Sequence, residues 1–224
     1  MNVSSIHYTR TAVFLHWLIG FAILGMLAFG LYMTGLPKDA PKVAAFDLFD
    51  LGIYTLHVAE PISPRTLYFN LHKSIGITLL VLIVLRIVWR FIHKPPVPLD
   101  SWKAWERRLS GLSHKALYVL MIVMPLSGII MSAYGKYSVK WFGVVLIDGM
   151  DNKSIREAFL SVHEIAAWIL LGFIALHVVG AAGALNHGQD LVQGGRQQFQ
   201  HGALGQRRFR HVDFVFHHHH QPSF

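Results

Sequence analysis

The sequence contains no cysteine among its 224 residues, and charged residues make up only 14% of it. The missing thiols exclude disulfides, iron–sulfur clusters, thiolate zinc sites and haem attached through a Cys-x-x-Cys-His motif. The low charge argues against an ordinary soluble domain, in which about 25% of residues are charged. Hydrophobic residues instead make up 53% of the chain, so the composition indicates a membrane protein.

Four long apolar segments predict four transmembrane helices, because a helix crosses a bilayer with about 20 apolar residues and pairs its own backbone polar groups. The first apolar stretch, Thr11 to Pro37, has no charged residue and is too long for a signal-peptide core. A capping-box pattern at Ser154 to Glu157 predicts the start of the last helix. The fold class is therefore all-α, an integral membrane four-helix bundle. The predicted spans are about residues 11–34, 67–92, 115–134 and 155–185.

The distribution of lysine and arginine predicts the orientation of the bundle. The two termini and the loop between the second and third spans, with its flanking residues, hold twelve basic residues against four acids. The other two loops hold eight of each. Basic loops stay in the cytoplasm, so both termini should be cytoplasmic and the protein should lie in the bacterial inner membrane. The net charge of +8 is then mainly a topology signal, and no nucleic-acid-binding motif accompanies it.

The chain is expected to have two parts. Residues 1–190 form the membrane domain, and residues 191–224 form a basic, His-rich cytoplasmic tail that we expect to be flexible. The tail contains the run His217 to His220, to which we assign no function.

Histidine is unusually abundant, with 15 residues. Polar side chains inside membrane spans are costly and usually functional. His163 and His177 are fourteen residues apart in the last span, which is nearly four helical turns and a rise of about 21 Å. One helix therefore presents an imidazole to each half of the bilayer, an arrangement that suits two stacked haems, each with two axial histidines. Five histidines lie in or at the ends of the spans: His16, His72, His114, His163 and His177.

The expected depths of these histidines suggest how they pair. His72 is the only other membrane histidine in the half of the bilayer that holds His163. The half that holds His177 has two candidates, His16 and His114, and spacing alone does not choose between them.

Fourteen-residue spacings recur on the other helices. Arg86 follows His72 by fourteen residues and is a candidate partner for a haem propionate; the alternative is that it snorkels to the membrane surface. Gly30 follows His16, and Gly128 follows His114, by the same fourteen residues. A glycine at such a position leaves room for a macrocycle.

Five stretches of the sequence carry a family resemblance, in the family's order. They are Leu15-His16-Trp17-Leu18, Leu71-His72-Lys73-Ser74-Ile75-Gly76, Leu85 to Arg90, Pro125-Leu126-Ser127-Gly128, and His163-Glu164 with Leu176-His177. Through them the chain resembles the prokaryotic cytochrome b561 family over about residues 6–190.

The resemblance implies a bundle with two haem b groups, one between His16 and His177 and one between His72 and His163. It also implies electron exchange with quinone, and one activity known in the family is superoxide oxidation coupled to ubiquinone reduction. His114 and His187 are candidates for a quinone or proton-transfer site. The segment between His177 and His187 is longer than the family usually has, and the tail matches nothing recognisable, which weakens the resemblance at that site.

Three functions remain open from the sequence. The first is electron transfer between quinone and either superoxide or a soluble periplasmic redox protein. A rim of basic residues on the periplasmic side would attract an anion such as superoxide. The second is a cytochrome b subunit that anchors a separate dehydrogenase. The third is a metal-ion transporter, which the scarcity of acids inside the spans argues against, since Glu164 is the only acid near a span interior. The basic rim comprises Lys73, Lys136, Lys140, Lys153 and Arg156.

Overall fold

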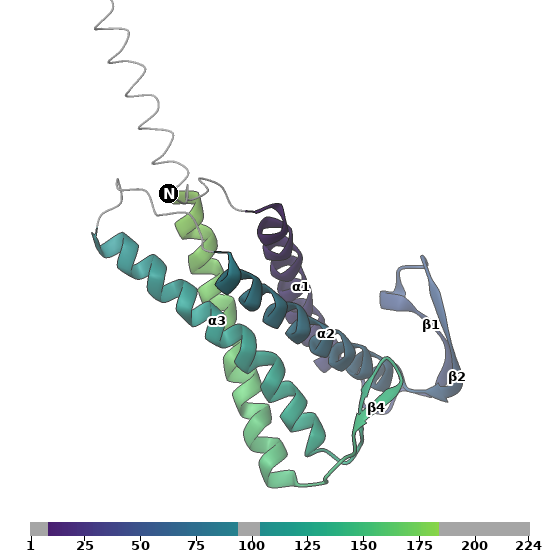
Figure 1. Cartoon of the computed structure of the whole chain (residues 1–224). Helices are drawn as coiled ribbons and strands as arrows, with labels where there is room; N and C mark the ends of the chain where they lie inside the picture. Colours follow the sequence, from purple (N-terminus) through teal and green to yellow (C-terminus); the bar gives the residue numbers. More distant parts are fainter. Residues whose placement is uncertain (1–8, 94–103, 184–224) are drawn as a thin grey trace, which may run out of the picture. The chain divides into compact units, whose positions relative to one another are not determined.

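The computed structural model describes residues 9–93 and 104–183. In that part of the chain, four helices are long and apolar enough to cross a membrane, which confirms the predicted bundle (Figure 1). By contact the chain divides into two compact units, residues 1–174 and 175–224, with the boundary inside the fourth helix. The helices are α1 (Arg10–Thr34), α2 (Pro64–Ile92), α3 (Ala104–Ala133) and a fourth helix, Lys153–Gly183.

The third helix differs most from its predicted bounds. It begins at Ala104 instead of near Lys115, so the segment before the apolar stretch continues the same helix. The residues before the apolar run include several charges, so the hydropathy pattern did not predict that the helix begins there. Pro125 lies inside α3, where membrane helices tolerate proline because neighbouring groups pair the freed backbone.

Side-chain caps define the helix starts. Thr9 accepts a hydrogen bond from the amide of Ala12 (3.2 Å) at the start of α1, and Ser63 accepts one from Thr66 (3.3 Å) at the start of α2. The fourth helix begins one residue before Ser154, because Asn152 is its cap.

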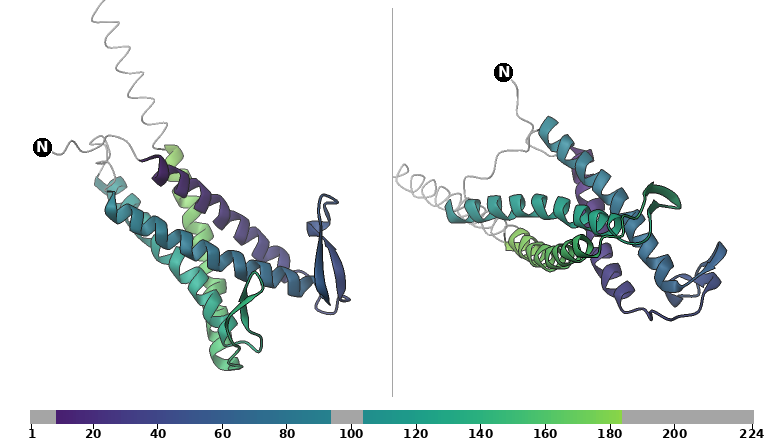
Figure 2. Two further views of the ribbon diagram at one scale, coloured as in Figure 1. Left: turned by 45° about the vertical axis from the view of Figure 1, so that its right-hand side comes forward. Right: turned by 90° about the horizontal axis from the view of Figure 1, so that it is seen from below.

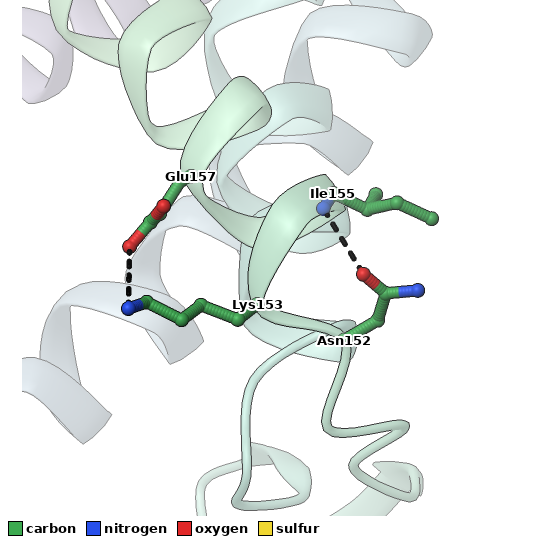
Figure 3. Close-up of polar contacts among 4 residues, drawn as sticks. All are labelled: Asn152, Lys153, Ile155 and Glu157. Atoms are coloured by element: carbon green, nitrogen blue, oxygen red, sulfur yellow. Dashed lines mark hydrogen bonds and ion pairs between the residues drawn. The ribbon is translucent and has the colours of Figure 1, made fainter.

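Figure 3 shows this cap and a neighbouring ion pair. The side-chain oxygen of Asn152 accepts from the amide of Ile155 (3.2 Å), and Lys153 pairs with Glu157 one turn later (3.8 Å). The prediction that Ser154 caps the fourth helix was therefore wrong, because the cap is Asn152, two residues earlier. Asn152, Lys153 and Ser154 are all polar, so the sequence did not reveal which of them caps the helix.

Two β-hairpins, which the sequence analysis treated as loops, join the helices at one end of the first unit; we call this the hairpin end (Figures 1 and 2). The antiparallel strands β1 (Val43–Asp47) and β2 (Thr55–Ile62) connect α1 to α2. The strands β3 (Val139–Trp141) and β4 (Val144–Ile147) connect α3 to the fourth helix. The second turn places Phe142 and Gly143 at φ 45° and 95°, the positive values of a tight two-residue hairpin turn.

The second hairpin packs on α2 through hydrogen bonds. The hydroxyl of Ser74, which is 3% exposed, accepts from the amide of Phe142 (2.9 Å). The indole of Trp141 donates to the hydroxyl of Thr78 (3.0 Å). Both hydroxyls also donate to carbonyls of their own helix, Ser74 to Asn70 (2.9 Å) and Thr78 to Ser74 (3.0 Å), so they link the hairpin to the backbone of α2.

An aliphatic core holds the helices of the first unit together. Ile19 and Ile23 of α1 pack with Leu79 and Ile83 of α2 and with Leu170 of the fourth helix, and all five are buried. Most other large apolar side chains on the helices are exposed, as expected where lipid replaces water around a bundle.

Arg65 joins the end of α1 to the start of α2. Its guanidinium donates to the backbone carbonyl of Leu36 (2.8 Å) and lies near the carbonyls of Thr34 (3.4 Å) and Met33 (3.5 Å). It also stacks 4.7 Å from the ring centre of Phe69. Met33 and Thr34 end α1 and Leu36 follows it. Carbonyls at a helix C-terminus lack partners further along the helix, so Arg65 adds a charged donor to the cap of α1 from the neighbouring helix.

We expect Arg65→Met to lower the free energy of unfolding by about 1–3 kcal/mol, because it leaves these carbonyls without their charged donor. The measurement is the thermal midpoint of helical circular dichroism in mild detergent. Arg156→Met is the matched control, since Arg156 is exposed at the start of the fourth helix. Equal changes in the two variants would show that Arg65 does not cap α1.

Candidate functional site

His72 of α2 and His163 of the fourth helix face one another inside the first unit. Their ring centres are 6.4 Å apart and their planes cross at 79°. Two metal–nitrogen bonds of about 2 Å, on opposite sides of one ion, bring imidazole ring centres to about 6–6.5 Å. The gap is therefore wide enough for a haem iron with one histidine on each side, and the role of the pair as ligands stays a prediction.

The ring of His163 is held by α3. Its Nδ1 lies 2.8 Å from the backbone carbonyl oxygen of Met124 and 3.2 Å from the hydroxyl of Ser127. Because a carbonyl only accepts, Nδ1 carries the proton and Nε2 keeps its lone pair. That is the tautomer in which Nε2 binds a metal, with the second nitrogen bonded to a carbonyl that fixes the ring.

Glycines make room for both rings. A Cβ at Gly128 would lie 3.0 Å from Cε1 and 3.2 Å from Nδ1 of His163, and one at Gly30 would lie 3.5 Å from Cε1 of His72. The fourteen-residue spacing placed both glycines in this layer of the bundle, and the structure finds them there. The contact at Gly128 is the tighter one, so a methyl group there would require the His163 ring to shift by a few tenths of an ångström.

Aromatic side chains surround His72 on the side of the first hairpin. Phe29 lies 5.7 Å from His72 between ring centres, and Tyr68 packs edge-on against Phe29 at 5.8 Å. The Tyr68 hydroxyl accepts from the amide of Phe49 (2.8 Å), which fixes the hairpin over this cluster.

An apolar cavity of about 50 Å³ lies between the helices, and both histidines line it. Ligand sites are commonly apolar, with a few convergent polar groups. Here the polar groups are two imidazoles, the donor set that holds a b-type haem, so the residues fit that group. Other residues of the wall include Met26, Gly76, Met121 and Pro125.

The second predicted pair has one member in each unit. His16 is half-buried on α1 in the first unit, and His177 is half-buried on the fourth helix in the second. Their pairing stays a prediction.

Arg86 is half-buried on α2, and its Nη1 has no hydrogen-bond partner among the described residues. A buried guanidinium nitrogen in this state is a suitable donor for a carboxylate such as a haem propionate.

The remaining candidates lie away from the cavity or outside the described residues. His114 is exposed on α3, and its Nδ1 lies 2.6 Å from the carbonyl oxygen of Ser110, one turn earlier. This contact does not bear on the predicted role of His114 in quinone binding or proton transfer. His187 and the whole tail, residues 191–224, lie outside the described residues.

The sequence analysis did not identify Met124 and Ser127 as partners of His163. The partner atom of Met124 is a backbone carbonyl, which has no sequence signal that would reveal it.

Comparison with known proteins gives a consistent result. Residues 7–192 match the family model described as prokaryotic cytochrome b561. The chain is 34% identical over 172 residues to cytochrome b561 homolog 2 of Escherichia coli (strain K12), covering 77% of this chain and 79% of that protein. It is 25% identical over 117 residues to cytochrome b561 homolog 1 of the same organism, covering 52% of this chain and 65% of that protein.

We expect Gly128→Ala to reduce haem content, because the new methyl carbon pushes the His163 ring out of line at an overpacking cost of about 1–3 kcal/mol. The measurement is a pyridine haemochrome count with a reduced-minus-oxidised spectrum. Gly25→Ala is the control, since a Cβ there meets nothing within 4 Å. Equal haem content in the two variants would contradict the tight contact at Gly128.

Proposed function

The chain belongs to the prokaryotic cytochrome b561 family, and we propose that it carries two haem b groups and exchanges electrons with quinone. Membership of the family makes it a multi-pass bacterial membrane electron-transfer protein that binds haem b. The observation that best supports the proposal is the His72–His163 pair, with its 6.4 Å ring separation across an apolar cavity.

The second haem is proposed for His16 and His177. This pairing follows the family resemblance and the fourteen-residue spacing of His163 and His177 on one helix. Arg86 lies on α2 fourteen residues beyond His72, so it belongs to the layer of the second haem. Its unpaired Nη1 would bind a propionate there and offset its charge.

The protein's own residues do the positioning. When bound, haem supplies one-electron chemistry at its iron. The Met124 carbonyl keeps the proton of His163 on Nδ1, so that Nε2 faces the cavity as a ligand. The aliphatic and methionine side chains of the wall exclude water from the site, and Gly30 and Gly128 keep the space beside the two rings open.

The proposed orientation and a periplasmic donor together define the proposed direction of electron flow. With the hairpin end in the periplasm and both termini in the cytoplasm, the chain lies in the inner membrane. An electron enters at the site of His72 and His163 and leaves at the site of His16 and His177. A quinone near the cytoplasmic surface takes two electrons and two protons to become quinol, and His114 and His187 are the candidate residues for binding it or relaying the protons.

Superoxide is the proposed donor because basic residues gather near the hairpin end. Lys136 and Lys140 are exposed beside and on the second hairpin, and Lys73 is half-buried next to His72. A cationic rim attracts a small anion and raises its rate of encounter. Each superoxide gives up one electron and leaves as dioxygen, so two of them reduce one ubiquinone.

The haem assignment predicts stoichiometry. We expect about two haems b per chain in the wild type and about one in His163→Ala or His16→Ala, because each variant removes an axial ligand from one site. Full occupancy is expected in His114→Ala. The measurement is a pyridine haemochrome count on protein purified in mild detergent.

Two results would contradict this assignment. A wild type without haem would remove the cytochrome proposal for this chain. Loss of haem in His114→Ala, with full occupancy in His16→Ala, would mean that the second pair is His114 and His177.

The superoxide proposal predicts a charge effect. We expect Lys136→Glu with Lys140→Glu to slow haem reduction by superoxide about tenfold at low salt, with a smaller difference at high salt, because the steering charge is reversed and then screened. Lys115→Glu is the control, as Lys115 is exposed on α3 away from the hairpins. Stopped-flow spectra of haem reduction test this; equal rates in all three proteins at low salt would rule out steering by this rim.

A further inference from the structure

The two histidines that face each other across the cavity are held in different ways. Nδ1 of His163 lies within hydrogen-bond distance of the Met124 carbonyl (2.8 Å) and the Ser127 hydroxyl (3.2 Å). Nδ1 of His72 is buried and has no hydrogen-bond partner in the part of the chain that the structure describes.

This difference matters because a haem ligand must bind through a nitrogen without a proton. The proton then sits on the other ring nitrogen. In His163 that N–H donates to a carbonyl, which fixes the ring and makes Nε2 a stronger ligand. If His72 binds through Nε2 in the same way, its Nδ1–H is buried with no acceptor among the described residues, and an unpaired buried donor weakens the state that requires it.

The packing around the two rings also favours His163 as the more firmly held ligand. The backbone at Gly128 comes so close that a Cβ there would lie 3.0 Å from the His163 ring, while a Cβ at Gly30 would lie at an ordinary 3.5 Å from the His72 ring. His163 therefore has little room to turn. Among the described residues, the nearest aromatic ring to His72 is that of Phe29, at 5.7 Å between ring centres and with no hydrogen bond to the imidazole.

Ser127 is the side chain that completes the support of His163. It is 3% exposed, it donates to the Met124 carbonyl (2.9 Å), and its oxygen lies 3.2 Å from Nδ1 of His163. The hydroxyl therefore contacts both partners of the histidine–carbonyl bond. Removing it changes the strength and direction of that bond while leaving both histidines in place.

We propose that His163 is the anchored ligand and His72 the exchangeable ligand of the haem between them, with Ser127 as a positioning residue for His163. The inference rests on the proposed function, since it assumes that this pair binds haem. The coordination position that opens lies on the α2 side of the iron. It would accept a small, neutral nitrogen base in place of His72.

The experiment compares His72→Gly with His163→Gly, each purified with and without excess imidazole. We expect His72→Gly to keep about two haems per chain, one of them five-coordinate and high-spin, and imidazole to return that haem to the low-spin form. We expect His163→Gly to fall to about one haem, with no recovery in imidazole. Haem counts, absorption spectra and electron paramagnetic resonance report the outcome.

The results separate failure of this inference from failure of the proposed function. Equal loss and equal rescue in the two variants, or the reverse order, would overturn the inference while leaving the histidine pair as ligands. Two low-spin haems in both variants would instead mean that His72 and His163 are not the ligands, and the proposed site would fail with the inference.

Ser127→Ala provides a test that does not depend on losing a ligand. We expect a shift in the midpoint potential of one haem and no change in the other, with Ser127→Thr restoring the wild-type value. Ser161→Ala is the control, since Ser161 bonds only its own helix, at the Glu157 carbonyl (3.2 Å). A wild-type potential for both haems in Ser127→Ala would exclude Ser127 as a positioning residue.

Discussion

The need to pair every polar group away from water governs this molecule. Inside a bilayer an unpaired donor or acceptor is costly, and this cost explains features that are far apart in the sequence. Arg65 donates to carbonyls at the end of α1, the second hairpin donates to Ser74 on α2, and the Met124 carbonyl accepts a hydrogen bond from Nδ1 of His163. Each contact lets a polar group remain within or beside an apolar helix.

Buried polar atoms without a partner are informative because leaving them unpaired is costly. Among the described residues, three of the buried side-chain atoms without a partner lie on helices: Nδ1 of His72, Nη1 of Arg86 and Oγ of Ser113. His72 belongs to the proposed site of one haem, and Arg86 lies in the expected layer of the other. An unpaired buried group calls for a specific explanation. A propionate would explain Arg86, whereas an iron bound at Nε2 of His72 would leave Nδ1 as the unpaired N–H of the less firmly held ligand. Nothing in the structure explains Ser113.

The sequence predicted those features that have a strong and repeated signal. Four apolar runs gave the four helices, and the fourteen-residue spacing placed His72, His163, Gly30 and Gly128 in one layer. It could not predict the hairpins, because Phe142 occupies a positive-φ turn position where asparagine or glycine is the usual signal. It could not identify the Met124 carbonyl either, since every residue carries a backbone carbonyl and only the packing of α3 against the fourth helix selects this one.

The supports of the proposed haem also show how binding and folding are linked. His163 and its partners Met124 and Ser127 come from α3 and the fourth helix, whereas His72 and its neighbour Phe29 come from α2 and α1. An iron bound to both histidines therefore joins two pairs of helices. A cofactor that binds the folded protein alone adds its binding free energy to stability. Because the α3 side already fixes its histidine without the cofactor, that half of the site is prepared in advance.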